Sequence, residues 1–293
     1  MKVIRFFIRF LSLKKILSKV PKSDFGDRVF CFFMFVYAHG RIPKRKSGLV
    51  NDYFYFLKIS SEALNVTRQF TSDKKLVKIY ISSVLGNNYV VPTKKIFYSV
   101  EEIKDLEKLS PCVLKPAHSS GTVVFIESGR SKLTSLERDL LRSSLESSPY
   151  VTAREKNYKY LTPSIICEEM LPDGASTKDY KFFCFNGRVK AIQVDSDRQS
   201  RHKRNMYDSH WNPLRFSYNF PIGEWEGAPS KFSEMKTLAE LISSGFESVR
   251  VDFFMSGDKL YIGELTHCPE SAHGKFETLE AEKIFSQRYF SEK

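Results

Sequence analysis

Two β-strands joined by a loop of small residues are predicted by the stretch Cys112-Val-Leu-Lys-Pro-Ala-His-Ser-Ser-Gly-Thr-Val-Val-Phe-Ile126. Lys115 stands at the end of the first apolar run, directly before the loop. A lysine ammonium and the backbone N–H groups of a Ser/Gly loop suit the oxygens of a phosphate chain. The stretch therefore predicts a phosphate-binding unit, with Lys115 opposite loop residues Ser119, Ser120 and Gly121. A solvated strand-end lysine beside a plain hairpin loop is the alternative.

A second hairpin is predicted near the other end of the chain. It consists of Val249-Arg-Val-Asp-Phe-Phe254, a turn at 256–258, and Leu260-Tyr-Ile-Gly-Glu-Leu-Thr266. The carboxylates Asp252 and Glu264 fall on adjacent strands, and two nearby carboxylates suit Mg²⁺. Asp252 lies between apolar neighbours, where a buried charge requires a cation or a donor. Both magnesium and an ion pair with Arg250 satisfy that requirement. Together the two hairpins predict a nucleotide triphosphate site.

Composition narrows the class of protein. The 293 residues are 42% hydrophobic, which is ample for a folded core, and the formal net charge is +12. The five cysteines are scattered and never form a Cys-x-x-Cys pair, which argues against a disulfide or zinc framework. The positive charge favours an anionic partner without choosing among nucleotide, nucleic acid, acidic polymer and membrane surface.

The N-terminal segment is basic and amphipathic. Residues 1–22 carry seven Lys and Arg side chains among apolar residues and contain no acid. Contact with anionic lipid and docking of an N-terminal helix on the domain both remain open. The apolar run 29–38 is too short to span a bilayer, so we predict a buried helix there and no transmembrane segment.

The remaining pattern predicts an α+β fold with mostly antiparallel strands. Helices are predicted at 51–70, 74–85, 99–109 and 232–242, and Thr134-Ser-Leu-Glu137 is a capping box that opens another helix. Short strands are predicted at 89–92, 95–98 and 165–168. Strands at 180–185 and 189–194 are joined by Asn186-Gly187, a sequence typical of a type I′ hairpin turn.

In order and spacing, these segments resemble the ATP-grasp superfamily, and more closely its TupA-like branch. The matching stretches are 73–74, 113–121, 165–171, 179–187, 194–198, 206–208, 211–212 and 249–266. The resemblance implies an ATP-grasp domain at 51–293, whereas the basic N-terminal segment and connector at 1–50 match nothing in the family pattern. Its lobes would be approximately 51–170 and 171–293, with ATP and Mg²⁺ between antiparallel sheets.

The resemblance also implies a reaction, namely ligation of a carboxylate to an amine through an acyl phosphate. In this branch the expected substrates are a carboxylated sugar or polysaccharide precursor and an amino acid or amine, used in surface or capsular polysaccharide synthesis. We expect a cytoplasmic protein, with peripheral contact at the inner face of the membrane and no nucleic-acid partner. Two alternatives stay open: a phosphotransferase of the same fold, and a non-catalytic basic protein that binds membrane or nucleic acid.

Site residues follow from the resemblance position by position. Lys115 and the loop would bind the phosphates of ATP, and Arg250 would bind the transferring phosphoryl group. The adenine would be bound by the strand end, which consists of Glu168, Glu169, Met170 and Leu171. Asp179 and Lys181, which alternate onto one strand face, would approach the phosphates from the second wall or form a surface pair. Metal ligands would be Asp252, Glu264 and Thr266, and the groups Asp197, Arg198, His202 and Arg204 suit a carboxylated sugar.

Two positions depart from the family pattern. Thr266 stands where most ATP-grasp enzymes carry a metal-binding Asn, and a hydroxyl oxygen can still serve as a ligand. Ala272 stands where the branch has a glycine, which calls into question the conformation of the loop around it.

Overall fold

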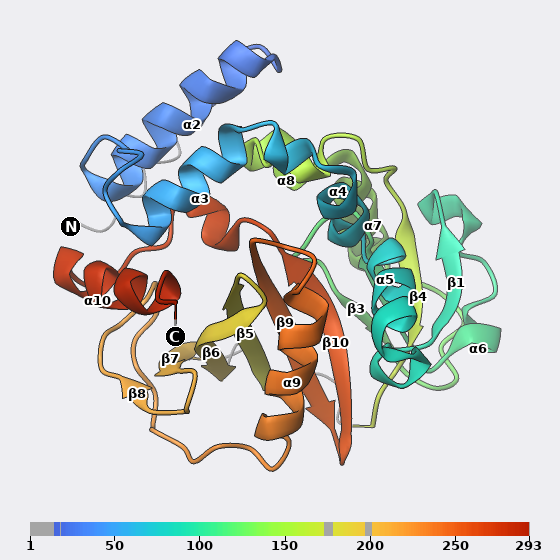
Figure 1. The fold of residues 1–293 in the computed structure, drawn as a ribbon. Coiled ribbons are helices and arrows are strands. Elements are labelled where there is room, and N and C mark those ends of the chain that lie inside the picture. Colours follow the sequence, from blue (N-terminus) through green and yellow to red (C-terminus); the bar gives the residue numbers. More distant parts are fainter. Residues whose placement is uncertain (1–14, 18, 173–177, 197–200, 293) are drawn as a thin grey trace.

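Two antiparallel sheets organise the computed structural model, which describes residues 15–17, 19–172, 178–196 and 201–292 (Figure 1). The four-stranded sheet has the order β1-β4-β2-β3, and the six-stranded sheet has the order β10-β9-β5-β6-β7-β8. The strands are β1 Thr93–Phe97, β2 Cys112–Pro116, β3 Val124–Ile126, β4 Ile165–Glu169, β5 Asp179–Phe185, β6 Arg188–Ser196, β7 Lys203–Asp208, β8 Pro213–Leu214, β9 Ser248–Ser256 and β10 Lys259–Thr266. The predicted α+β class is therefore confirmed.

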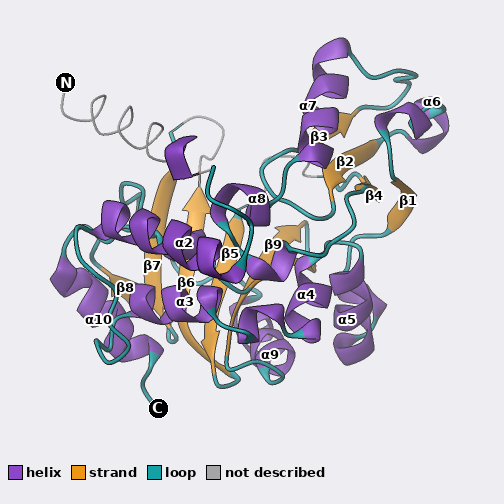
Figure 2. Ribbon diagram, turned by 90° about the horizontal axis from the view of Figure 1, so that it is seen from above, coloured by secondary structure: helices purple, strands orange, loops and turns teal. Residues whose placement is uncertain are grey.

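Helices cover both sheets (Figure 2). The α-helices are α2 Asp24–His39, α3 Val50–Ile59, α4 Val66–Ser72, α5 Leu76–Leu85, α6 Leu106–Leu109, α7 Ser135–Glu146, α8 Pro149–Ala153, α9 Phe232–Ser243 and α10 Leu279–Tyr289. Short 3-10 segments are η1 Glu62–Leu64, η2 Asn87–Tyr89, η3 Val100–Glu102, η4 Lys156–Tyr158 and η6 Pro269–Ala272. Among the described residues, no helix is both long and apolar enough to cross a membrane.

Local sequence signals account for several boundaries. Asn186 and Gly187 both have positive φ, 49° and 70°, as a type I′ turn between β5 and β6 requires. Both hydrogen bonds of the predicted capping box are present, because the Glu137 N–H donates to Thr134 Oγ1 and the Thr134 N–H donates to Glu137 Oε2. The hairpin and the capping box are thus confirmed.

We expect Thr134→Ala to lower the free energy of unfolding by about 1 kcal/mol, because an alanine leaves the first turn of α7 without its side-chain cap. Urea unfolding measures the change. Ser131→Ala serves as the control, since Ser131 is exposed and lies just before the same helix. Equal stability of both variants would show that the cap contributes nothing.

Other boundaries were predicted wrongly. The predicted helix 51–70 is divided into α3, η1 and α4, because the Asn65 side chain accepts from the Thr67 N–H and starts a new helix. The segment predicted as a strand at 89–92 forms no strand, and η2 occupies its start. The helix after Asp73 begins at Leu76 rather than Lys74, since the Asp73 side chain accepts from the Lys75 N–H.

The two faces of the six-stranded sheet pack against different helices. One face, with Phe182, Ile192 and Val251, packs against α9 and α5. On the other face, Phe183, Ala191 and Met206 share an apolar cluster with α2, α3 and α10. That cluster includes Leu17 of the basic N-terminal segment, whereas residues 1–14 lie outside the described residues. Helix α2 is therefore docked on the core.

Candidate active site

A row of polar side chains crosses one face of the six-stranded sheet. The register pairs Glu264 of β10 with Asp252 of β9, Asp252 with Lys181 of β5, and Lys181 with Gln193 of β6. Directly opposed residues project from the same face. Residues far apart in sequence therefore converge on one surface, and the predicted carboxylates Asp252 and Glu264 are neighbours.

A β-bulge at Gly263 produces this alignment. Ile262 pairs with Phe253 and Glu264 pairs with Asp252, so the register shifts by one residue between them. Without the extra residue, Gly263 rather than Glu264 would oppose Asp252. Bulges occur next to active sites, where they redirect side chains. The sequence signal for this bulge is a glycine in a strand interior, and it did not enter the prediction of the site.

Asp252 is held by two cations. Arg250 donates to both carboxylate oxygens, from Nε at 2.7 Å and Nη2 at 2.6 Å, and Lys181 Nζ lies 3.2 Å from Oδ2. Arg250 also donates to Thr266 Oγ1 at 3.1 Å, and that hydroxyl donates to Glu264 Oε1 at 3.1 Å. The ion pair with Arg250, which the sequence left open beside magnesium, is thus present in the structure.

The row continues around Asp195 of β6. Lys181 Nζ lies 3.5 Å from Asp179 and 3.8 Å from Asp195, and Lys181 is buried, so its contact with Asp179 is not an exposed surface pair. Burial alone would raise the pKa of Asp195, but the Arg204 guanidinium outweighs it and holds the pKa at about 2. His202 Nε2 lies 3.2 Å from the same carboxylate. Two of the four predicted sugar-binding residues therefore contact Asp195, whereas Asp197 and Arg198 lie outside the described residues.

A second charged group lies on the four-stranded sheet. Glu168 of β4 accepts from Lys115 Nζ at 2.5 Å and from Lys78 Nζ of α5 at 2.6 Å. Burial would raise the pKa of Glu168, yet the two ammonium groups hold it below its usual range. Lys115 and Glu168 are therefore not solvated strand-end residues, and their side chains are 18% and 5% exposed. No pattern in the sequence pointed to Lys78 as a member of this group.

Lys74 connects the two charged groups. Its Nζ donates to the backbone oxygen of Ser119 at 2.5 Å and lies 3.7 Å from Glu264 Oε2. Burial would raise the pKa of Glu264, but Lys74, then Arg250 and Lys181, lower it to about 2. The loop after β2 and the carboxylate on β10 thus meet at one ammonium group. Lys74 was in a matching stretch, but the sequence assigned it no role.

Buried His118 fixes the start of the loop. The Ser164 N–H donates to His118 Nδ1 at 3.3 Å, and Nε2 lies 3.1 Å from the Ser147 carbonyl oxygen. Burial lowers the pKa of this imidazole, which favours its neutral form. His118 therefore ties β2 to the chain before β4 and to the end of α7, while Ser119 and Ser120 follow it into the loop.

A cavity of about 390 Å³ opens beside this loop. Nine of its thirteen lining residues carry hydroxyl groups: Ser119, Ser120, Thr122, Ser143, Ser144, Ser147, Ser148, Thr152 and Ser271. Glu155, which also lines it, accepts a hydrogen bond from Ser271 Oγ, and burial raises its pKa. Glu155 lies near enough to Arg250 and Glu264 for both charges to act on it. The cavity therefore borders the charged groups.

The loop around Ser271 retains a left-handed backbone without glycine. Glu270, Ser271 and Ala272 have φ values of 51°, 55° and 63°. Ala272 thus adopts the conformation that the family glycine favours, and the substitution does not abolish it. The loop is held by Lys58 Nζ, which donates to the Ser271 carbonyl oxygen at 3.0 Å, and by the contact between Glu270 and Arg204 at 2.9 Å.

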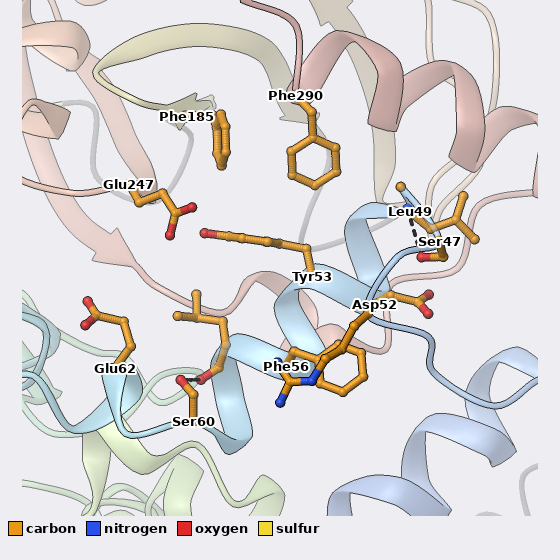
Figure 3. A pocket seen from close by; sticks show the side chains of 13 residues that line it. Ser47, Leu49, Asp52, Tyr53, Phe56, Ser60, Glu62, Phe185, Glu247 and Phe290 are labelled. Carbon is orange, nitrogen blue, oxygen red and sulfur yellow. Dashed lines mark hydrogen bonds between the residues drawn. The ribbon is translucent and has the colours of Figure 1, made fainter.

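A different cavity, of about 500 Å³, lies between α3, the 45–49 connector and Phe290 (Figure 3). Figure 3 shows Tyr53, Phe185 and Phe290 around it, with the carboxylates of Glu62 and Glu247 nearby. Aromatic rings and acids do not suit a triphosphate. None of the predicted site residues appears among its described lining residues.

The described residues contain no cluster of three or more His, Cys, Asp or Glu side chains suited to a metal ion. They do offer Asp252 and Glu264 at paired positions, with the Thr266 hydroxyl beside Glu264. Mg²⁺ in nucleotide enzymes is commonly bound by one or two carboxylates plus substrate phosphates and waters. This donor set therefore fits magnesium that arrives with a nucleotide.

Comparisons with known proteins were made for the whole chain. A family model described as TupA-like ATPgrasp matches residues 57–288, and no curated protein matches. An L-amino acid ligase from Bacillus licheniformis is 13% identical, with a TM-score of 0.44 over 75% of this chain and 49% of that chain. D-alanine–D-alanine ligase from Bacillus anthracis is 15% identical, with a TM-score of 0.39 over 68% and 58%. The ATP-grasp ligase PsnB is 12% identical, with a TM-score of 0.38 over 74% and 60%. The chain spans about half to three fifths of these solved proteins.

Proposed function

Because the chain belongs to the TupA-like ATP-grasp family, we propose that it ligates a carboxylate to an amine at the expense of ATP. Membership confirms the predicted family and the ATP-grasp fold. The reaction itself is our proposal. It is carried by one observation, the contacts of Lys74 with both the Ser119 carbonyl and Glu264, which join the loop to the carboxylate row.

We assign the phosphates of ATP to the region around Lys74, between the loop at Ser119 and the carboxylate of Glu264. Lys115 and Lys78 share the single carboxylate of Glu168, so these three side chains together carry a net charge of +1. That charge suits the α- and β-phosphates, and the backbone N–H groups from Ser119 to Gly121 suit the terminal phosphate. The strand end from Glu168 to Leu171 would meet the adenine.

Magnesium would be held by Asp252 and Glu264, with the Thr266 hydroxyl beside them. When bound, Mg²⁺ supplies positive charge that offsets the negative charge of the phosphoryl oxygens. Arg250 and Lys181 already hold Asp252 in one orientation, which pre-organises the site. Arg250 would also donate to the transferring phosphoryl group.

The proposed chemistry has two displacements. A carboxylate oxygen of the substrate attacks the γ-phosphorus of ATP, the bond to the bridging oxygen breaks, and ADP leaves. The amine nitrogen then attacks the carbonyl carbon of the acyl phosphate, inorganic phosphate leaves, and the nitrogen loses a proton to form the amide. Glu155 is a candidate acceptor for that proton, because it lines the cavity beside the charged groups and burial raises its pKa.

We place the carboxylate substrate in the hydroxyl-lined cavity beside Ser119. Its lining exchanges hydrogen bonds readily with a polyhydroxylated molecule, since each hydroxyl both donates and accepts. This favours a carboxylated sugar, such as a precursor of a surface polysaccharide, as the acyl donor. Arg204 and His202, bound to Asp195, would lie toward the amine or the far end of the sugar.

Lys115→Met tests the nucleotide site. We expect at least a tenfold loss in affinity for ATP, about 1.4 kcal/mol, because one of the two phosphate-binding cations is removed. Titration calorimetry with a non-hydrolysable ATP analogue measures it. Lys104→Met, an exposed lysine of the same lobe, is the matched control. Wild-type affinity in Lys115→Met would contradict the assignment.

Product analysis tests the reaction. Wild-type protein, ATP, candidate uronic acids and amino acids are combined, and an amide product together with ADP and phosphate is expected. Phosphorylated carboxylate formed without any need for an amine would support a phosphotransferase instead. Absence of nucleotide binding by the wild-type protein would favour the non-catalytic alternative.

A further inference from the structure

Helix α2 carries apolar side chains on two opposite faces. Its inner face, with Phe30, Met34 and Phe35, is buried in the core. A second apolar stripe, called here the outer stripe, consists of Phe25, Val29, Phe32, Phe33 and Val36. Successive members are four, three, one and three residues apart, and these spacings place them on one face of a helix, opposite the inner face.

The three phenylalanines of the outer stripe are exposed to solvent, and its two valines are partly buried. Phe25 is 78% exposed, Phe33 48% and Phe32 36%. Figure 1 shows α2 at the periphery of the molecule, with α3 on its inner side. The sequence predicted a buried helix at 29–38, and this is wrong for half of its circumference, because the core covers only one side. A contiguous exposed aromatic stripe marks an interaction surface more reliably than single exposed residues do.

Positive charge is concentrated in the same part of the chain. Residues 1–48 contain twelve Lys and Arg side chains and two Asp, which accounts for ten of the twelve excess positive charges. Both acids are already neutralised, since Asp27 pairs with Arg154 at 3.0 Å and Asp24 with Lys156 at 2.8 Å. Lys22 and Arg28 are exposed around the N-terminal half of the stripe, and exposed Lys44, Arg45 and Lys46 follow in the connector.

We propose that the outer stripe of α2 docks on an anionic membrane surface. The three phenylalanines would enter the boundary between headgroups and acyl chains, and the basic residues around them would bind anionic headgroups. A second copy of the chain fits less well, because a symmetric contact through this face would oppose two strongly positive surfaces. Docking would hold the nucleotide site at the bilayer surface.

Vesicle co-sedimentation tests the proposal. Full-length protein should bind vesicles of phosphatidylcholine with phosphatidylserine, and should bind pure phosphatidylcholine vesicles at least tenfold more weakly. The triple variant Phe25→Ser, Phe32→Ser and Phe33→Ser should lose at least tenfold in partitioning to anionic vesicles. Its control, Val66→Ser, Ile79→Ser and Leu136→Ser, removes equally exposed apolar side chains elsewhere and should bind like wild type.

Two further measurements test whether the triple variant folds and whether residues 1–14 alone account for vesicle binding. Thermal unfolding should show that the triple variant folds, since the replaced side chains are exposed. Deletion of residues 1–14 should weaken binding while leaving it sensitive to the triple substitution. Unchanged binding of the triple variant, dependence on residues 1–14 alone, or a dimer that the triple substitution dissociates would each overturn the proposal.

Discussion

Glu264→Gln is expected to lower turnover by several orders of magnitude while leaving the β9–β10 hairpin folded. Its pKa of about 2 means that Glu264 is ionised at every working pH, so the amide removes a full negative charge beside Asp252. Amide oxygens are poorer ligands for hard cations than carboxylates, and each tenfold loss of rate corresponds to about 1.4 kcal/mol. Phosphate release from ATP, with the carboxylate and amine substrates present, is the assay.

The matched control is Glu107→Gln, which removes the same charge from an exposed position on α6. It should leave the rate unchanged. Nucleotide binding without magnesium should persist in Glu264→Gln, because Lys115 and Lys78 are untouched. Since the folded pKa of Glu264 is depressed, its charge is lost only as the pH falls through about 2, so no titration of this group should appear in the activity profile above about pH 4. An unimpaired variant would remove Glu264 from the catalytic assignment.

The parts of the site that the sequence predicted depend on local patterns. Lys115 ends an apolar strand before a small-residue loop, and Asp252 lies in a strand whose partner follows after a short turn. Both arrangements require only strand alternation and one hairpin, which a single sequence records. The family resemblance added the order of the segments, and hence the pairing of two lobes.

The parts that the sequence did not predict depend on tertiary contacts. Lys78 lies on an amphipathic helix, where a lysine usually faces solvent, and only the docking of α5 on β4 brings it to Glu168. Lys74 acquires two partners from segments 45 and 190 residues away. The hydroxyl-lined cavity combines serines from separate segments, and serines in loops and exposed helices carry no local signal of convergence.

Helix α2 is a case in which the sequence predicted more burial than the structure shows. Its apolar run predicted burial, since hydropathy records how much apolar surface exists but not how many neighbours cover it. In the structure one half faces α3 and the sheet, and the other half has no described neighbour that buries it. The packing of α2 on the core therefore depends on the contacts of its buried side.

The anchor is a buried ion pair, and breaking it should be the most destabilising single change in this region. Arg154→Leu is expected to lower the free energy of unfolding by about 3–5 kcal/mol, because it removes the cation that pairs with the fully buried Asp27 carboxylate. Among the described residues, the Tyr150 hydroxyl then remains as a hydrogen-bond donor to that carboxylate. Arg154 also donates to the Val20 carbonyl at 2.7 Å, so the chain before α2 loses its tether as well. Urea unfolding measures the change.

Asp27→Leu and the double variant complete the cycle. The double variant should be less destabilised than the sum of the single variants, because an apolar pair leaves no uncompensated buried charge. Arg142→Leu is the control, since the pairs of Arg142 with Glu101 and Asp139 are both solvent-exposed and should each contribute at most about 1 kcal/mol. If the two single losses simply added, Asp27 and Arg154 would not be coupled, and α2 would be held by its apolar inner face alone. Vesicle binding by Arg154→Leu then separates the two roles of the helix: a loosened α2 that still binds membrane would show that the outer stripe acts independently of its anchor.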